Sequence, residues 1–380
     1  MRNKRVGRMA VAGCCRGLLA VVVCGMLAAV AIAKEPKSFV VHEWGTFSTF
    51  SGSDGAYLKF YPNDDDLPDF VYKRHRNVKG GLPDAFVSLE TPVMYFYSDR
   101  DRTLSVDVKF PKGMMTDYYP QASRPPVNSL RWDNLKIMKQ GDGSLSLLPG
   151  AGRYFVARET DASLLQASEK KENEKFLFYR GVGDFQMPFT VRADGKGAFT
   201  FKNNSQDAVP GFFLVRVEGK KVYFKAGGHL SPQDDVKIQE STEASTAEKL
   251  GEAVAKLLIE QGLYDKEAHA MVKTWSSDWF GQDGTRLIYI VPESLTADFL
   301  PLRIDPKPEK VLRVLVGRHD RLTPEREREV EALVRRLNGA SNAESQAADR
   351  ILNQMGRYRW AAQSAAVKRI KSSESAQARP

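Results

Sequence analysis

Apolar and polar residues alternate with a period of two through much of the chain between residues 34 and 230. The run "FTVRADGKGAFTF" alternates on both sides of Asp194-Gly195, and "GFFLVRVEGKKVYFKAGG" alternates around Glu218-Gly219. Such runs around a turn glycine predict β-hairpins, because glycine readily adopts the positive φ that these turns require. With further aromatic and β-branched runs, the pattern predicts a large antiparallel, β-sandwich-like N-terminal half. The polar stretch 163–173 is expected to form a loop or a short helix.

The period changes to that of a helix in residues 231–371, so the fold class is α+β. Ser245 stands three residues before Glu248, a capping-box spacing, at the start of an amphipathic run that ends at Gly262. A second helix is expected over "YDKEAHAMVKTW" and a third after Thr323-Pro324. Between them, "TRLIYIVPESL" and "KVLRVLVGR" predict short buried strands, which either belong to a smaller α/β half or join the first sheet. Residues 372–380 are expected to be disordered.

Residues 1–33 have the features of a secretory signal peptide: a basic start, an apolar core and the small-residue pattern Ala31-Ile32-Ala33. The alternative is an uncleaved anchor, for which the apolar run is short. A lipid anchor at Cys24 is disfavoured by Val23, because a small residue normally precedes such a cysteine. We therefore expect an exported chain, periplasmic or extracellular, with no stable transmembrane span after cleavage.

Composition excludes cysteine chemistry, because all three cysteines lie in the leader. The leader also carries five of the basic residues behind the formal charge of +9, so the charge of the mature chain is near +4. His42-Glu43 lacks the second histidine of a zinc hydrolase, since Thr46 stands in its place. The other histidines are isolated, no G-x-S-x-G motif occurs, and Gly181-Val182-Gly183 lacks the third glycine of a dinucleotide site. We predict neither a metal nor a cofactor.

Carboxylates remain the most general candidates for chemistry. Glu43, Glu90, Glu159 and Asp161 lie in or beside predicted strands, where a carboxylate needs a partner or shifts its pKa. Two interpretations stay open for them: ion pairs that tie strands together, with Arg158 or Arg180 as partners of Glu43 and Glu159, and paired catalytic carboxylates. The acidic run 63–66 either holds calcium or is a solvated loop, and it lacks the EF-hand spacing.

Three predicted strands, "VHEWGTF", "ETPVMYFY" and "YFVARETDA", mix aromatic with ionisable residues. Core packing explains most of the aromatic residues equally well, but this mixture slightly favours a ligand site. The candidate ligand or ion-pair cluster is His42, Glu43, Trp44, Glu90, Tyr95, Arg158, Glu159, Asp161 and Arg180. In the stretch "VVHEWGTFSTF", strand alternation without a bulge places Glu43, Gly45 and Phe47 on one face and His42, Trp44 and Thr46 on the other.

The C-terminal run "RYRWAAQSAAVKRIK" interleaves basic residues with Tyr358 and Trp360. In an exported protein nucleic acid is not the expected partner, and a helix against an anionic envelope surface or a solvated basic helix is preferred.

Six segments resemble those of a family of exported bacterial proteins of unassigned function: "VHEWGTFST", "ETPVMYFYS", "DYYPQA", "RYFVARETDA", "EKFLFYRGVGDF" and "VLRVLVGRHDRLTPE". The resemblance extends from about Val40 to about Glu325, and that family usually has Thr where Ser48 stands. It implies export but no activity and no catalytic residue.

Two functions follow from the residues. The preferred one is a non-catalytic exported protein whose β domain binds a small molecule, a glycan or an envelope component. The alternative is an exported hydrolase, with a glycan as one possible substrate, that uses paired carboxylates about 5 to 9.5 Å apart. Glu43 and Glu159 each locked to an arginine would favour the first.

Overall fold

The computed structural model describes residues 39–62, 66–74, 84–123, 126–139, 145, 152–167, 171–339 and 341–377. It confirms an α+β fold, with strands dominating the N-terminal half and helices the C-terminal half. The signal peptide lies outside the described residues. Among the described helices, none combines the length and the apolar character needed to cross a membrane.

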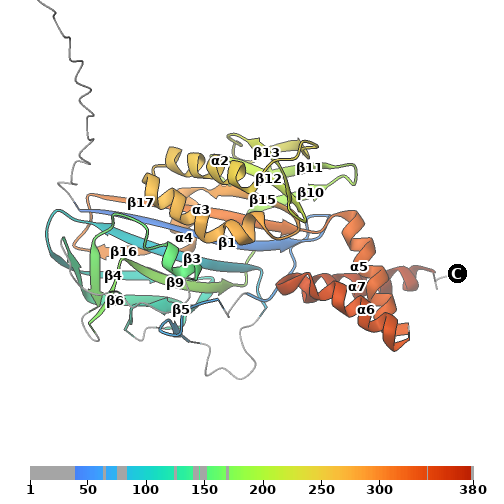
Figure 1. Cartoon of the computed structure of the whole chain (residues 1–380), viewed down its shortest axis with the longest axis horizontal. Helices are drawn as coiled ribbons and strands as arrows, with labels where there is room; N and C mark the ends of the chain where they lie inside the picture. Colours follow the sequence, from blue (N-terminus) through green and yellow to red (C-terminus); the bar gives the residue numbers. More distant parts are fainter. Residues whose placement is uncertain are drawn as a thin grey trace, which may run out of the picture. The chain divides into compact units, whose positions relative to one another are not determined.

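A central sheet of nine strands organises the fold (Figure 1). In spatial order its strands are β13 (Lys221–Gly227), β12 (Phe212–Glu218), β15 (Gly284–Val291), β17 (Lys310–Arg321), β1 (Val40–Ser51), β3 (Val87–Tyr97), β9 (Phe176–Gly183), β5 (Gly113–Tyr119) and β2 (Tyr72–Lys73). All neighbours are antiparallel except β1 and β17, which are parallel over twelve residue pairs from Val40↔Lys310 to Ser51↔Arg321. The two strands predicted over "TRLIYIVPESL" and "KVLRVLVGR", β15 and β17, thus belong to the same sheet as the N-terminal strands. This sheet therefore contains strands from both sides of residue 230.

Two smaller sheets cover one face of the central sheet. One has the order β16 (Leu302–Asp305), β4 (Arg102–Lys109), β6 (Ser129–Met138), β7 (Leu164–Ala167) and β8 (Glu172–Glu174), and the other has β10 (Phe189–Ala193), β11 (Ala198–Asn203) and β14 (Asp235–Gln239). In β4, Leu104, Val106 and Val108 are buried while the residues between them are not, as the alternating pattern predicts. These side chains pack with Phe47 and Leu89 of the central sheet in one apolar core.

Helices cover the other face of the central sheet (Figure 1). They are α1 (Arg153–Val156), α2 (Ala247–Glu260) and α3 (Asp265–Phe280). Trp44 of β1 and Val93 of β3 pack there against Leu258 of α2 and Trp275 of α3 in a second core. The short helix α4 (Glu293–Phe299) connects β15 to β16.

The chain ends in a helical group beyond the C-terminal ends of β1 and β17 (Figure 1). It consists of α5 (Pro324–Gly339), α6 (Asn342–Asn353), the 3₁₀ turn η2 (Gly356–Tyr358) and α7 (Arg359–Gln377). Their apolar faces enclose Phe50, the penultimate residue of β1, together with Phe60 and Leu322.

Both predicted hairpins form, with Gly195 at φ 72° and Gly219 at φ 60°. The predicted helices form too, but the N-cap of α2 is Thr246, one residue later than expected, and its side chain accepts a hydrogen bond from the Lys249 amide. Three expectations are wrong. The stretch 163–173 contributes to β7 and β8, "RYFV" is helix α1 instead of strand, and α7 continues through Ser372 to Gln377.

Candidate functional site

Strand β1 is buried along its whole length, and its two faces meet different surroundings. Trp44 lies in the helix-side core and Phe47 in the core between the sheets, so the predicted alternation is confirmed. A bulge is present, but it lies on β3: Thr91 and Pro92 stand opposite Gly45, and Thr91 has φ 50°. In a regular strand, residues 90 and 93 would face opposite sides of the sheet. The extra residue in the bulge changes this alternation, so that Glu90 and Val93 both point to the helix side.

Glu43 points to the face opposite Trp44 and is fully buried and paired, as predicted, although its partners are not the predicted ones. Its Oε2 lies 2.5 Å from Arg313 Nε, and Tyr179 donates its hydroxyl hydrogen to Oε1. Burial, together with the charge of Glu43, raises the pKa of Tyr179, which keeps this phenol a neutral donor. Arg313 stands directly beside Glu43 in the parallel register, a neighbour that no local pattern predicts.

The two arginines expected as partners of Glu43 bind other carboxylates. Arg158 contacts Glu174 at 2.7 Å, and Arg180 contacts Asp66 at 2.6 Å. Glu159 is held by Lys273, not by an arginine.

The remaining members of the predicted cluster are dispersed. His42 Nδ1 lies 2.8 Å from Glu267 of α3, and the Tyr95 hydroxyl donates to the Ala157 carbonyl. Glu159 and Asp161 lie beside β7, between it and α1, and their carboxylates are on the surface, where each contacts a lysine. Two pairs are exceptions: the rings of Trp44 and Tyr95 lie 6.2 Å apart in the helix-side core, and Glu90 and Arg180 are brought together on the helix side of the sheet.

Glu90 and Arg180 belong to a continuous set of charged contacts that we call the arginine–carboxylate network. It extends over β3, β9, β15 and β17 and is covered by α1, the C-terminal end of α3 and η2. Its linked members are Asp66, Glu90, Arg153, Arg180, Asp278, Gln282, Arg286, Arg318, Asp320, Arg357 and Tyr358.

One half of the network is centred on Asp320 of β17. Its carboxylate accepts from Arg318 Nε at 2.5 Å, from Arg286 Nε at 2.9 Å and from the Tyr358 hydroxyl at 2.8 Å. Arg318 also donates to the Gln282 side chain at 2.7 Å. Burial alone would raise the pKa of Asp320, but Arg318 and Arg286 outweigh it and lower that pKa far below its usual range.

In the other half, the carboxylates of Glu90 and Asp66 hold further arginines. Glu90 is bonded to Arg357 and accepts from the Ser48 hydroxyl at 2.9 Å. Burial acts to raise the pKa of Glu90, yet Arg357 lowers it below the usual value. Asp66 accepts from Arg180 and, at 3.0 Å, from Arg153, and these charges outweigh burial and lower its pKa to about 2.

The network reaches solvent at Gln282 and at the edge formed by Arg153 and Asp66, and it leaves a hydroxyl unused inside. Arg153 and Asp66 keep 22% and 19% of their side-chain surfaces exposed, so a ligand can reach this edge. Thr46 is 0% exposed and stands opposite Glu90 in the β1–β3 register, and its Oγ1 has no hydrogen-bond partner within the part of the chain that the structure describes. A buried hydroxyl without a partner costs free energy, which is typical of sites that a ligand or an ordered water completes.

Other chemistry receives less support. Among the described residues no group of three or more His, Cys, Asp or Glu side chains is placed to hold a metal ion. His319 contacts the hydroxyls of Thr49 and Ser51, each at 2.8 Å, but all three are buried on the opposite face of the sheet. Burial, followed by the charge of Arg321, lowers the pKa of His319 to about 3, so we interpret this trio as structural.

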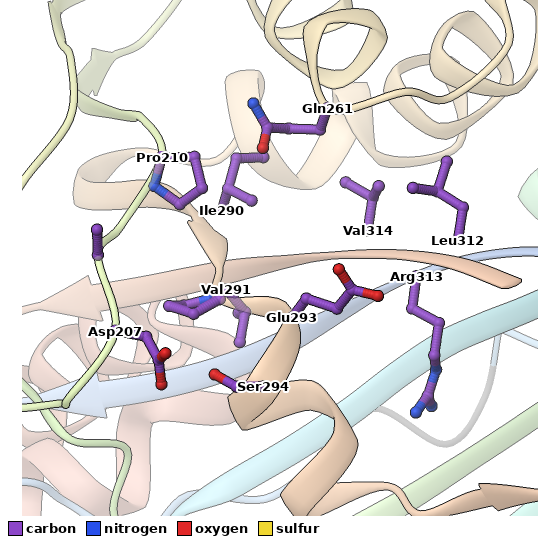
Figure 2. Close-up of a pocket in the computed structure, with 12 residues that line it drawn as sticks. Asp207, Pro210, Gln261, Ile290, Val291, Glu293, Ser294, Leu312, Arg313 and Val314 are labelled. Carbon is purple, nitrogen blue, oxygen red and sulfur yellow. The ribbon is translucent and has the colours of Figure 1, made fainter.

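A separate pocket of about 350 Å³ lies where β15 ends beside β17 (Figure 2). Leu312 and Val314 point to one side of β17 and Arg313 to the other. The pocket shares no residue with the arginine–carboxylate network.

Comparisons with known proteins add little. No family model matches the chain, and no curated protein matches it. Among solved structures, the yeast delta-COP-I mu-homology domain, alone and complexed with a Dsl1 WxWxV peptide, gives a TM-score of 0.33 at 6% identity, covering 75% of this chain and 98% of that chain in each case. This overlap is too poor to support an inference about function.

Sequence reasoning missed most of the network. Asp66 was considered only within an acidic run, whose other residues, 63–65, lie outside the described part of the chain. The detectable signal was in β17, where Arg318 and Asp320 lie two residues apart at the end of a buried strand, and in β15, where Arg286 precedes a run of buried apolar residues. Charges at every second position of a buried strand indicate a shared polar face.

Proposed function

We propose that this chain is an exported, non-catalytic binding protein and that the exposed edge of the arginine–carboxylate network holds a neutral, hydroxyl-rich ligand such as a glycan. Export rests on the leader at residues 1–33, whose pattern predicts a cleaved signal peptide. The ligand class rests on the network.

The observation that carries the proposal is the Thr46 hydroxyl, which is buried beside Glu90 and has no hydrogen-bond partner among the described residues. The ligand would enter the network at the partly exposed Asp66–Arg153 edge and reach this hydroxyl from there. Groups around it offer donors and acceptors together, because each carboxylate lies within contact distance of a guanidinium. Sugar hydroxyls donate and accept at once, so they match such paired groups better than a simple anion or cation does.

The balance of positive and negative charges in the network also favours a neutral ligand. Asp117 is not one of the linked members named above, but it is 2% exposed and stands beside Arg180 in the β5–β9 register, so its charge acts on the network. The five arginines, 153, 180, 286, 318 and 357, are then matched by the five carboxylates 66, 90, 117, 278 and 320. A neutral ligand leaves this balance undisturbed.

The alternative of a carboxylate-based hydrolase is less well supported. A glycosidase needs a general acid whose pKa is raised, so that it is protonated near neutral pH. The pKa values of Asp66, Glu90 and Asp320 are instead lowered by their arginines. Carboxylates with lowered pKa values stay ionised. They can accept hydrogen bonds, and they therefore orient the arginines and the hydroxyls of a ligand.

The test is calorimetric titration of the mature protein with neutral gluco- and chito-oligosaccharides, using a galacturonate oligosaccharide as the charged comparison. Thr46→Val keeps the shape of the side chain and removes the hydroxyl. We expect it to weaken binding of the neutral ligand about 5-fold to 10-fold, the value of one hydrogen bond of about 1 kcal/mol. The melting temperature should stay the same or rise, because an unsatisfied buried group is removed.

Thr49→Val is the matched control. Its hydroxyl is already bonded to His319 on the opposite face, so this change should lower stability and leave the dissociation constant unchanged. Absence of saturable binding by every neutral oligosaccharide, or a Thr46→Val protein that binds as tightly as the wild type, would contradict the proposal.

A further inference from the structure

The free part of strand β17 lies where its partner β15 stops. Their antiparallel pairing runs from Thr285↔Arg321 to Val291↔Leu315 and ends because the next residue, Pro292, has no N–H to continue the ladder. The preceding residues of β17, Lys310 to Val314, pair with β1 alone among the strands of the described ranges. Alternate backbone N–H and C=O groups of this segment therefore face away from β1.

The pocket of about 350 Å³ lies along this edge. Leu312 and Val314 point together to one side of β17, towards Ile290 and Gln261 (Figure 2). An added strand could therefore pair with this edge of β17, in line with β15, and pack its side chains against this apolar strip.

The rim of the pocket is acidic. Asp207 and Glu293 line it, and neither carboxylate forms a salt bridge with a residue that the structure describes. The one cation in the lining, Arg313, is already neutralised by Glu43. A positively charged side chain on the occupant would therefore meet uncompensated negative charge.

We propose that this pocket binds an extended, basic polypeptide segment, which pairs with residues 310–314 of β17 as an added antiparallel strand. Alternate side chains of such a strand point to opposite sides. Apolar ones meet Leu312 and Val314, and the lysines or arginines between them approach Asp207 and Glu293. Main-chain hydrogen bonds supply the affinity, and the two kinds of side chain supply the selectivity. This site is distinct from the glycan site proposed above and does not depend on it.

The probe is a fluorescein-labelled peptide, acetyl-Val-Lys-Val-Lys-Val-amide, followed by fluorescence polarisation. We expect saturable binding with a dissociation constant tighter than about 1 mM. The Val-Glu-Val-Glu-Val peptide and a Val-Lys-Val-Lys-Val peptide methylated at alternate backbone nitrogens should both bind at least about 10-fold more weakly. The first loses the charge match, and the second loses ladder hydrogen bonds, which contribute about 1 kcal/mol each.

Two tryptophan substitutions on α4 separate the pocket from the surface around it. Ser294 lines the pocket and is exposed, so Ser294→Trp should fill the pocket and weaken peptide binding at least about 10-fold. Ala297 is exposed on the same helix but is not part of the lining, so Ala297→Trp should bind like the wild type. Equal melting temperatures of the two variants would show that both fold.

Charge is tested separately with the double variant Asp207→Asn, Glu293→Gln, which should bind the lysine peptide more weakly and the glutamate peptide no worse. Slower amide hydrogen exchange in residues 310–314 on peptide addition would support strand pairing. The proposal is overturned if the lysine peptide does not bind, if the N-methylated peptide binds equally, or if Ser294→Trp and Ala297→Trp have the same effect.

Discussion

Glu43→Gln tests whether the buried ion pair between Glu43 of β1 and Arg313 acts as scaffold. Glu43 is 0% exposed, and the Arg313 side chain is 6% exposed. The amide of glutamine has nearly the shape of the carboxylate and can still accept a hydrogen bond from Tyr179 or Arg313. The substitution therefore removes a charge while leaving the packing in place.

The magnitude follows from the guanidinium that remains. Removing one partner of a buried ion pair leaves the other charge uncompensated, which costs about 3 to 5 kcal/mol. Arg313 keeps one hydrogen bond, from Nη1 to the Leu300 carbonyl at 2.6 Å, which does not neutralise it. For a unit of this size, about 1 to 2 °C of melting temperature is lost per kcal/mol, so we expect a decrease of about 3 to 10 °C.

The assay is thermal unfolding followed by circular dichroism, with oligosaccharide titration of the folded protein. A double variant, Glu43→Gln with Arg313→Met, removes both charges and should be more stable than the single variant. Binding should be unchanged, because Glu43 points to the face of the sheet opposite the network. A melting temperature within about 1 °C of the wild type would refute the reasoning. So would a stable, folded Glu43→Gln protein that had lost its ligand, because Glu43 would then belong to the site.

Two further predictions concern stability. His319 has a pKa of about 3 in the folded protein and about 6.5 when unfolded, so its contribution is complete above pH 6.5 and is lost as the pH falls towards 3. In urea unfolding between pH 6 and pH 4, His319→Asn should therefore reduce the slope of stability against pH by about 1.4 kcal/mol per pH unit, and equal slopes would contradict this. Gly45→Ala would place its Cβ 2.9 Å from Pro92 Cα, so it should cost about 1 to 3 kcal/mol, whereas Gly228→Ala, with nothing within 4 Å of its Cβ, should be neutral.

Sequence patterns predicted the elements that depend on residues close together in the chain. The hairpins at Gly195 and Gly219 follow from alternation and turn chemistry, and α2 follows from its apolar stripe and its cap. Tertiary contacts decided the parts that were missed. The mostly polar residues from Ser372 to Gln377 are typical of a disordered tail, yet they continue a helix whose preceding turns, at Ala362 and Ala366, pack against α5 and α6.

Such patterns could not identify contacts between residues that are distant in sequence. Glu43 was recognised as buried and paired, because a carboxylate inside an apolar strand requires a partner. Choosing Arg313 over Arg158 or Arg180 required knowing that β17 lies parallel to β1, 270 residues away in sequence. Glu90 reached the network through the bulge at Thr91, which shifts parity in β3 and leaves no clear signature in sequence.

The alternation of β1 allows one strand to serve as scaffold and as site. On one face, Glu43 joins β1 to β17 and β9 within the central sheet, through Arg313 and Tyr179, while Phe47 packs in the apolar core shared with the smaller sheets. On the other face, Ser48 fixes Glu90 and the Thr46 hydroxyl is left without a partner beside it. Substitutions at odd-numbered positions should therefore change stability, and those at Thr46 or Ser48 should change binding. Adjacent residues share one backbone, so a displacement of the strand would affect both groups of substitutions alike. If one group changes stability and the other changes binding, the cause must be the face of the sheet that each side chain occupies.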